Sequence, residues 1–458
     1  MSAPAPEEQN RATQGEADAA ALGAATGMPT GVPADDAHTV AIPAPAAHTP
    51  PSAGAAFTKR RSFVLMLAAL SAVGPFSIDT FLPALLELQA ALHATPLQAQ
   101  QALSAYLLGF GIMSLWHGAI SDAIGRRPVI LASLLVYIVA SLVCTFAPSI
   151  EILIAARLVQ GLAGGAGMIV ARAIIRDCFE GVRALQLLAT VMQIFSIAPA
   201  VAPVLGGYLQ NWWGWRSVFG FMLVGSIALL VWIWRALPET LPVSARHPLH
   251  PVTLAQSYWK VFTRVEFQLL AGLLGISFSS LFIYITASPV LMIRHLHLKE
   301  TDFAILFLPV IGGMVLGSIT ASKLAGRISQ RALINSGFAL MGFGLLLNLG
   351  LQYTVVPQTA PGFWLTVMVI APLGIGSVGQ ALLGPSIQMM VMDLYPQQRG
   401  LMSSCQGFTH VMMSAVTAGI ISPLVSDTTR HLVLASSAFY IVALALWLLY
   451  AATHRKPK

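Results

Sequence analysis

The stretch Phe63–Leu88, FVLMLAALSAVGPFSIDTFLPALLEL, is the part of the chain that decides the fold. At ~1.5 Å per residue, a helix of this length crosses the ~30 Å hydrocarbon core of a bilayer. One carboxylate, Asp79, lies in the outer part of this stretch, between Gly74-Pro75 and Pro83. A charge at that depth costs on the order of 3 kcal/mol or more. The sequence therefore predicts a membrane helix whose single acid has a function.

The composition excludes a soluble globular protein. The chain has 458 residues, of which 56% are hydrophobic and only 9% are charged, whereas soluble domains carry about 25% charged residues. The net charge of +7 would suit a nucleic-acid partner. However, the basic residues lie between apolar spans and form no extended patch. The three cysteines show no metal-ligand spacing. We therefore expect a lipid bilayer as the surroundings, with no nucleic acid and no metal.

The N-terminal tail, residues 1–61, differs from the rest of the chain. It is rich in Ala, Pro, Gly and Thr and shows no periodic apolar face, so we expect a disordered segment. It lacks the basic start and short apolar core of a secretory signal. Lys59, Arg60 and Arg61 directly precede the first span and should hold the tail in the cytoplasm.

Hydropathy predicts an all-α integral membrane protein with twelve transmembrane helices in two six-helix bundles. The bundles are expected at residues 62–237 and 267–454, joined by a cytoplasmic loop at 238–266. The first six spans are expected at about 63–88, 100–121, 128–147, 150–175, 185–210 and 217–237. The second six are expected at about 267–293, 302–326, 332–352, 361–390, 402–425 and 432–453.

The distribution of basic residues supports this topology. With the N-terminus inside, nineteen Lys and Arg residues fall on the cytoplasmic side, and four, Arg216, Arg294, Lys299 and Arg430, fall outside. Because basic residues are enriched in cytoplasmic loops, both termini are expected in the cytoplasm.

The two halves also look like distant copies. GAISDAIGRRPVIL begins at Gly118, and GSITASKLAGRISQRALI begins at Gly317. Both contain a Gly, then small residues, then Gly-Arg before a new apolar span, but Ala321 stands where the first copy has Asp122. The two segments begin about 200 residues apart in the chain, and this spacing indicates duplication of a six-helix unit.

Four motifs give a family resemblance. GAISDAIGRRP, from Gly118, resembles the loop signature of the major facilitator superfamily. ARLVQGLAGGAG, from Ala156, and APAVAPVLGGYL, from Ala198, resemble motifs of its proton-driven drug exporters, although Ala202 replaces a Gly of the antiporter motif. SIDTFLPALLEL, from Ser77, resembles the first-span signature of the bicyclomycin-resistance (Bcr/CflA) type.

The resemblance implies efflux of drugs or metabolites from the bacterial inner membrane by alternating access. It implies a proton gradient as the energy source, without any cofactor. It also assigns two groups of residues: a cytoplasmic gate motif and an antiporter motif. The gate motif comprises Gly118, Asp122, Gly125, Arg126 and Arg127, and the antiporter motif comprises Pro199, Pro203, Gly206 and Gly207.

Residue chemistry points to proton coupling at Asp79 and Arg157. An acid near an apolar cavity can exchange a proton near physiological pH, whereas arginine stays charged. Asp79 lies ~13 Å and Arg157 ~12 Å from the outer ends of their spans at helical rise, so an ion pair between them is geometrically allowed. The alternative is a static pair that ties span 1 to span 4.

The gate and antiporter motifs have simpler explanations too. Asp122 is expected to end span 2 and either pair with a loop arginine or cap a neighbouring helix, while Gly118 should permit close packing and Gly125 a tight turn. The arginines would alternatively be topology markers only. Prolines within span 5 should bend it, and its glycine pair should allow sliding contact between the halves, although a generic packing kink is the alternative.

Tyr106, Gln160 and Tyr284 are further candidates for the substrate cavity, although polar residues within spans more often form packing hydrogen bonds. The expected substrates are small, amphipathic and neutral or weakly charged. A monomer is expected because one chain can enclose its own path.

Other functions fit the sequence less well. The chain lacks the phosphate-binding Gly-x-x-x-x-Gly-Lys-[Ser/Thr] motif and common hydrolase motifs, so we expect no enzyme and no ATP-driven pump. A proton-coupled nutrient symporter remains an alternative, against which the span 5 motif weighs. A non-transporting membrane receptor or scaffold is a third, disfavoured by the presence of Asp79 and Arg157.

Overall fold

The structure is a computed structural model that describes residues 61–360 and 362–454, and this part of the chain is helical almost throughout. Within the described residues, twelve helical segments are long and apolar enough to cross a membrane, which confirms the predicted span count. The predicted tail, except Arg61, lies outside the described residues.

The helices of the N-terminal half are α3 (Arg61–Asp79), α4 (Leu85–Ala91), α5 (Pro96–Ile124), α6 (Arg126–Thr145), α7 (Ile150–Gly164), α8 (Ala166–Cys178), α9 (Gly181–Trp213) and α10 (Arg216–Ala236). The central segment contains η1 (Val243–Ala245) and α11 (Pro251–Phe262). The C-terminal half contains α12 (Val265–Thr286), η2 (Val290–His295), η3 (Glu300–Phe303), α13 (Ala304–Leu324), α14 (Gln330–Thr354), η4 (Val356–Gln358), α15 (Phe363–Asp393), η5 (Pro396–Gln398), α16 (Arg399–Val416), η6 (Thr417–Ile421), α17 (Ser422–Val425) and α18 (Thr429–Thr453).

Capping residues fix where several spans begin. Thr95 and Gln98 form a reciprocal capping box before α5, with Pro96 as its first residue. Ser149 and Ser329 accept hydrogen bonds from the first turns of α7 and α14. These side chains satisfy amide groups that a helix start leaves without partners.

Two predicted continuous spans of the N-terminal half are broken. Span 1, expected to run to Leu88, ends as α3 at Asp79, and the separate α4 follows. Pro83 disfavours helical geometry in the residue before it, which explains why the chain turns here. Span 4 is divided at Gly165 into α7 and α8.

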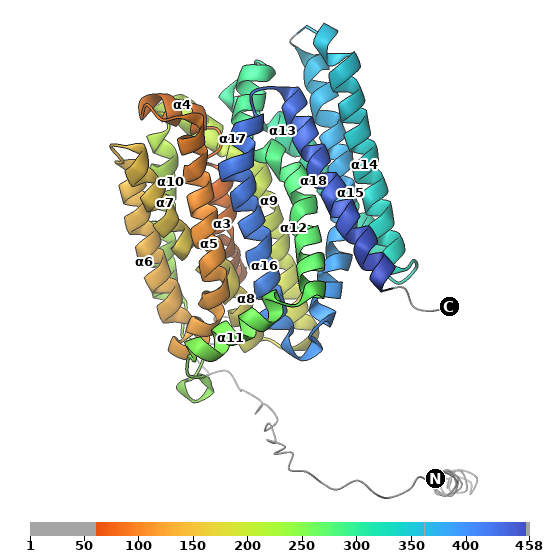
Figure 1. Cartoon of the computed structure of the whole chain (residues 1–458). Coiled ribbons are helices and arrows are strands. Elements are labelled where there is room, and N and C mark those ends of the chain that lie inside the picture. The colour runs from red at the N-terminus through yellow and green to blue at the C-terminus, as the bar shows by residue number, and fades with distance from the viewer. Residues whose placement is uncertain (1–60, 361, 455–458) are drawn as a thin grey trace, which may run out of the picture. The chain divides into compact units, whose positions relative to one another are not determined.

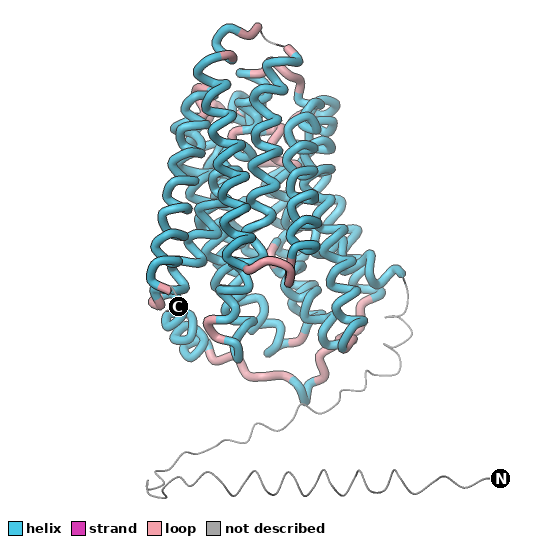
Figure 2. Tube along the Cα trace, turned by 90° about the vertical axis from the view of Figure 1, so that its right-hand side faces the viewer, coloured by secondary structure: helices cyan, strands magenta, loops and turns pink. Residues whose placement is uncertain are grey.

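Within each half, the helices pack mainly against one another. In the N-terminal half, α3 packs on α9, α5 on α7, and α6 on α7 and α10. In the C-terminal half, α15 packs on α13 and α14, and α12 on α18. The halves meet where α5 lies along α16 and α9 contacts η3 and α13. Figure 2 shows the helices as a long, roughly parallel array with short connections.

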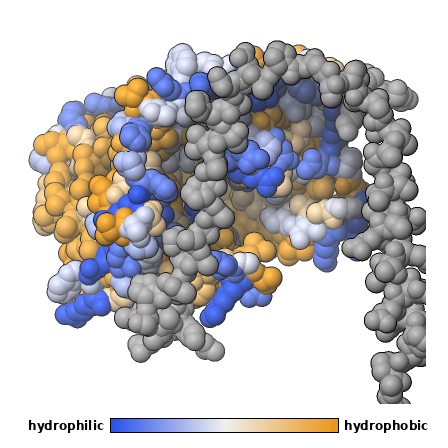
Figure 3. Space-filling view, turned by 90° about the horizontal axis from the view of Figure 1, so that it is seen from below, coloured by the Kyte–Doolittle hydropathy of each residue, from blue (hydrophilic) through white to orange (hydrophobic). Residues whose placement is uncertain are grey.

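The central segment is not only a loop. Its helix α11 was not predicted, and Figure 1 shows it lying across the lower end of the long helices, below α5 and α16. We call this end, which holds α11 and the Gly125 turn, the basic end, because the charge bias predicts it to be cytoplasmic. Figure 3 views it from below and shows hydrophilic residues around a hollowed surface, beside broad hydrophobic sides.

The apolar core differs between the two ends. At the end opposite the basic end, one continuous cluster joins residues of both halves, including Phe81, Leu209, Met292 and Phe303. Towards the basic end, the N-terminal half has its own cluster around Leu67 and the C-terminal half has another. The halves are therefore sealed together at the opposite end and have separate cores at the basic end.

Candidate transport site

Asp79 is the last residue of α3, at the break in span 1, and its side chain is only 7% exposed. Among the described residues, no Lys, Arg or His nitrogen lies within 4.0 Å of its carboxylate, and it accepts no hydrogen bond. A buried carboxylate without such partners is costly as an anion. This environment therefore favours the neutral acid.

One face of α3 leads from the basic end to Asp79. Leu65 and Ala69 are exposed on this face, Ala72 and Phe76 are partly buried, and Asp79 is buried. These residues recur at the three- and four-residue spacing of a helix face. Asp79 therefore lies at the closed end of a stripe that opens towards the basic end.

Arg157 is fully buried on α7, and its guanidinium is well satisfied. It donates to the backbone oxygen of Ser77 at 3.0 Å and to Gln160 Oε1 at 2.6 Å, with a longer bond to Ala102 O. The ring centroid of Tyr106 lies 4.4 Å from its central carbon. Carbonyl groups, an amide and an aromatic face together hold this cation without any carboxylate.

The ion pair between Asp79 and Arg157 that their depths allowed is not formed. The reason lies in the helix break: α3 ends at Asp79, and this end leaves the Ser77 carbonyl in the last turn able to accept from Arg157. The negative end of the helix attracts a cation, and Arg157 binds Ser77 O there. Arg157 thus holds the end of α3 in place, two residues from Asp79.

The three predicted cavity residues are enclosed within their own halves. Tyr106 lies against Arg157, and Gln160 links Arg157 to Ser141 Oγ. Tyr284 accepts a hydrogen bond from Asn348 at 3.3 Å. None is more than 2% exposed, so in this structure they pack within the helix bundles and do not line an open cavity.

The antiporter motif lies at the sealed end of the molecule. A methyl group added at Gly206 would overlap the carbonyl of Thr80, next to Asp79, and one at Gly207 would overlap the carbonyl of Glu300 in the other half. The two glycines therefore let α9 pass in backbone contact with both halves. α9 continues through Pro199 and Pro203 as one helix.

The gate motif forms an ion-pair cluster at the basic end. Arg126 binds Asp122 and also donates from Nε to Asp177 at 2.8 Å. The Asp177 side chain is 17% exposed and the Asp122 side chain 49%, so Asp177 is the better shielded partner. Asp177 was missed by sequence reasoning, although its position directly after Arg176 at the end of span 4 was a signal.

A second missed acid, Glu239, caps α6. Its carboxylate accepts from the backbone amides of Arg126 at 3.0 Å and Arg127 at 3.2 Å, a favourable place for an anion at a helix start. Of the two roles expected of Asp122, pairing with a loop arginine and helix capping, the structure shows the pair with Arg126 near the end of α5. Gly125 has a φ of 115°, which confirms the expected tight turn. Gly118, however, has only ordinary contact with Ile169.

Helix α11 connects the two halves at the basic end. Tyr258 donates a hydrogen bond to Leu115 O on α5, and its ring packs edge-on against Trp116. Tyr258 and Val261 also belong to the core of the C-terminal half. Burial raises the pKa of Tyr258 to about 12, so the phenol remains a donor at physiological pH.

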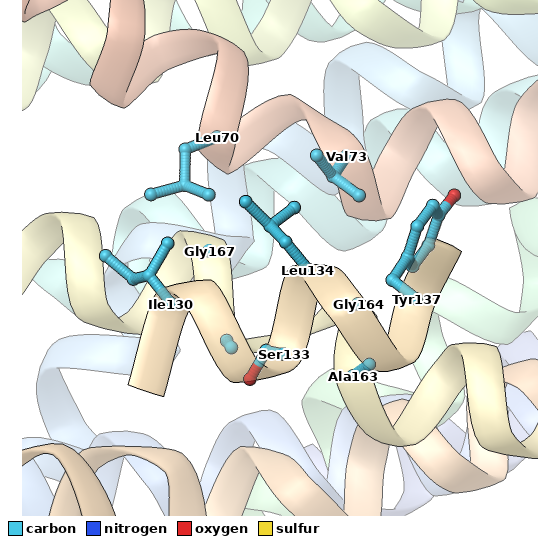
Figure 4. Close-up of a pocket in the computed structure, with 10 residues that line it drawn as sticks. Leu70, Val73, Ile130, Ser133, Leu134, Tyr137, Ala163, Gly164 and Gly167 are labelled. Atoms are coloured by element: carbon cyan, nitrogen blue, oxygen red, sulfur yellow. The ribbon is translucent and has the colours of Figure 1, made fainter. Parts of the chain in front are cut away.

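A small pocket lies behind this site and does not include it. Figure 4 shows it among α3, α6 and the α7–α8 region, lined mainly by apolar residues, with Tyr137 at one side. Its volume is about 10 Å³, room for about one water. Tyr137 hydrogen-bonds to Ser77 Oγ, so this region supports the end of α3 and is too small to receive a substrate.

Twelve spans in two halves, sealed at one end around a buried acid, define a multi-pass membrane protein of the transporter type. Residues 64–417 match the model of the Major Facilitator Superfamily, and the chain belongs to this family of transporters, which are not enzymes.

Similar proteins agree with this assignment and with the Bcr/CflA-type resemblance. The chain is 26% identical over 404 residues to a bicyclomycin resistance protein homolog of Haemophilus influenzae, covering 86% of this chain and 97% of the relative. It is 28% identical to multidrug resistance protein D of Escherichia coli, covering 84% and 95%. The fold is similar to the crystal structure of a D-xylose-proton symporter, with a TM-score of 0.63 at 13% identity, covering 85% of this chain and 98% of the other.

Proposed function

We propose that this chain is a proton-coupled exporter of small amphipathic drugs or metabolites in a bacterial inner membrane, acting as a monomer. The observation that carries the proposal is Asp79, a buried acid without a charged partner at the closed end of the α3 stripe. The names of the bacterial relatives, which concern resistance to bicyclomycin and to multiple drugs, support export of such compounds.

In the proposed cycle, Asp79 takes up a proton when the cavity is open to the outside. The cavity then closes at that end and opens at the basic end, as in this structure, where proton release accompanies substrate binding. The backbone contacts of Gly206 with Thr80 and of Gly207 with Glu300 would form the outer seal. Because Thr80 follows Asp79 directly, a change at the acid and a change at the seal can influence each other.

Reconstituted vesicles with an imposed pH gradient and an internal pH dye test this proposal. We expect at least one compound from a panel of amphipathic drugs to dissipate the gradient through the wild-type chain. Asp79→Asn should abolish that signal because the amide cannot carry the proton. Glu87→Gln changes an exposed carboxylate on the neighbouring α4 and should leave the signal intact.

Three outcomes would contradict the proposal. Full proton-coupled efflux by Asp79→Asn would remove this acid from the mechanism. Equal loss in Glu87→Gln would indicate a general effect of negative charge. Proton movement with nutrients, and with none of the drugs, would favour a symporter.

A further inference from the structure

Arg172 is a second arginine within span 4, and no feature described so far uses it. It lies on α8, six residues before the helix ends at Cys178, which is about 9 Å of helical rise. Among the described residues, its guanidinium has one hydrogen-bond contact, from Nη2 to the sulfur of Met192 at 3.7 Å. No carboxylate lies within 4.0 Å of it among the described residues.

Arg172 lies on a side of α8 that the neighbouring helices do not fully cover. α8 contacts α3, α5, α6 and α9. Met168, Ile169, Arg172 and Arg176 are incompletely buried and recur as a stripe along one side of α8, and the last-turn residues Asp177 and Cys178 are also partly exposed. Asp177, which binds Arg126 at the start of α6, lies about 140° around the helix from Arg172. The stripe therefore faces away from α6.

Helix α3, which packs against α8, carries exposed residues at the basic end. Leu65 and Ala69 lie on the α3 stripe that leads to Asp79, and the cores of the two halves are separate at this end. Arg172 therefore lies on the helix beside this stripe, closer to the basic end than Asp79 is.

The guanidinium at this depth lacks a counter-charge. Arginine remains protonated in proteins, and a thioether is only a weak acceptor. Its nearest charged neighbour on the stripe is another cation, Arg176, four residues away. A planar guanidinium binds a carboxylate or sulfonate through two parallel hydrogen bonds. An anion from outside the chain would supply the missing partner.

We propose that Arg172 binds the anionic group of an amphipathic organic substrate, such as a carboxylate or sulfonate, as it enters from the basic end. This inference rests on the proposed export function and narrows its substrates. It differs from the expectation of neutral or weakly charged substrates, because Arg172 and Arg176 make this side of the path cationic.

The test compares two probes of one aromatic amine scaffold: anionic 8-anilinonaphthalene-1-sulfonate and neutral N-phenyl-1-naphthylamine. Binding to the full chain in nanodiscs of zwitterionic lipid is measured by equilibrium dialysis, with empty nanodiscs subtracted. We expect wild type to prefer the anionic probe. Arg172→Gln should weaken binding of the anionic probe about tenfold, because the loss of one charge-assisted hydrogen bond changes affinity by about that factor. The affinity for the neutral probe should stay within about twofold of wild type.

Two further variants separate local recognition from general charge. Arg172→Lys keeps the charge and should retain part of the preference. Arg327→Gln removes an exposed arginine from the C-terminal half and should leave both probes unchanged. The proposal is overturned if wild type shows no preference for the anion, if Arg172→Gln weakens both probes equally, or if Arg327→Gln has the same effect as Arg172→Gln.

A lipid headgroup could supply the same anionic chemistry. Nanodiscs that contain anionic lipid form a separate arm, and we expect the Arg172-dependent preference to persist in them. Its complete loss there would assign the site to lipid and overturn the substrate proposal.

These measurements need no proton gradient, so they separate the two proposals. Asp79→Asn should keep the preference for the anionic probe while losing coupled efflux. A preference without any proton-coupled signal in wild type would leave Arg172 as a binding site and reject the proposed coupling.

Discussion

The two halves of the molecule share a six-helix plan but differ in the chemistry of their interiors. The N-terminal half buries Asp79 and Arg157 within its spans. At matching depth, the C-terminal half uses neutral groups, such as the Ser280–Ser436 and Tyr284–Asn348 hydrogen bonds. In the described part of the chain, the buried charges deep in the membrane therefore belong to one half.

The same difference occurs at the basic end. Arg126 of the N-terminal half binds two aspartates. In the corresponding segment of the C-terminal half, Ala321 replaces the first of them, and Arg327 is exposed with no carboxylate within 4.0 Å among the described residues. In the described part of the chain, the two halves thus share a helical plan, while only the N-terminal half has this ion-pair cluster.

Replacing Arg157 should produce the largest change in stability. Arg157→Met fills a similar volume but leaves Gln160 Oε1, Ser77 O and Ala102 O without their donor. Each buried acceptor left unpaired costs about 1–3 kcal/mol, so we expect a loss on the order of 3 kcal/mol in the free energy of unfolding. Thermal unfolding of the purified chain in detergent measures it, together with efflux of any transported drug.

The matched variant in the other half is Tyr284→Phe, which removes one neutral hydrogen bond to Asn348. It should cost only about 1 kcal/mol. Equal destabilisation by the two variants would contradict the contrast between a charged and a neutral half.

Much of the fold follows from the sequence because membrane spans are set by length and hydropathy. Twelve spans were predicted, and the tight turn at Gly125 was also predicted correctly. The break in span 1 was missed, although Pro83 was visible, because prolines also occur within continuous membrane helices, as Pro203 does in α9. Where the helix ends depends on what satisfies the carbonyl groups of its last turn, and here Arg157 binds Ser77 O.

The site was less predictable than the spans because its contacts depend on how the helices pack in three dimensions. Equal depth allowed Asp79 and Arg157 to pair, but the direction of each side chain depends on helix rotation, which one sequence does not fix. Glu239 lies more than a hundred residues from the amides it caps, and local patterns give no sign of such a contact. Side-chain partners therefore required the structure, whereas the membrane topology did not.

An intermediate effect is expected at the ion pairs of Arg126. Asp177→Asn weakens a shielded, charge-assisted bond at 2.8 Å and should cost about 2 kcal/mol. Asp122→Asn alters a half-exposed pair and should cost less than about 1 kcal/mol. Thermal unfolding and drug efflux should rank the two variants in this order.

Asp393→Asn supplies the control for these variants. It breaks an exposed pair with Arg399 in the C-terminal half and should cost close to zero, since exposed pairs contribute little. A larger cost for Asp122→Asn than for Asp177→Asn would show that exposure does not decide the strength of this cluster.

A small effect is also expected at the neutral Ser280–Ser436 pair of the C-terminal half. Ser280 and Ser436 each donate to the other's backbone oxygen, and their hydroxyl oxygens are 2.9 Å apart. Ser436→Ala should cost about 1 kcal/mol, and the double variant Ser280→Ala/Ser436→Ala should cost little more, because contacting residues are not additive. Thermal unfolding gives both values, and proton-coupled efflux should remain at the wild-type rate. A strong loss of coupled efflux without loss of stability would place part of the coupling machinery in the C-terminal half, and the division between a charged half and a neutral half would no longer describe how this protein works.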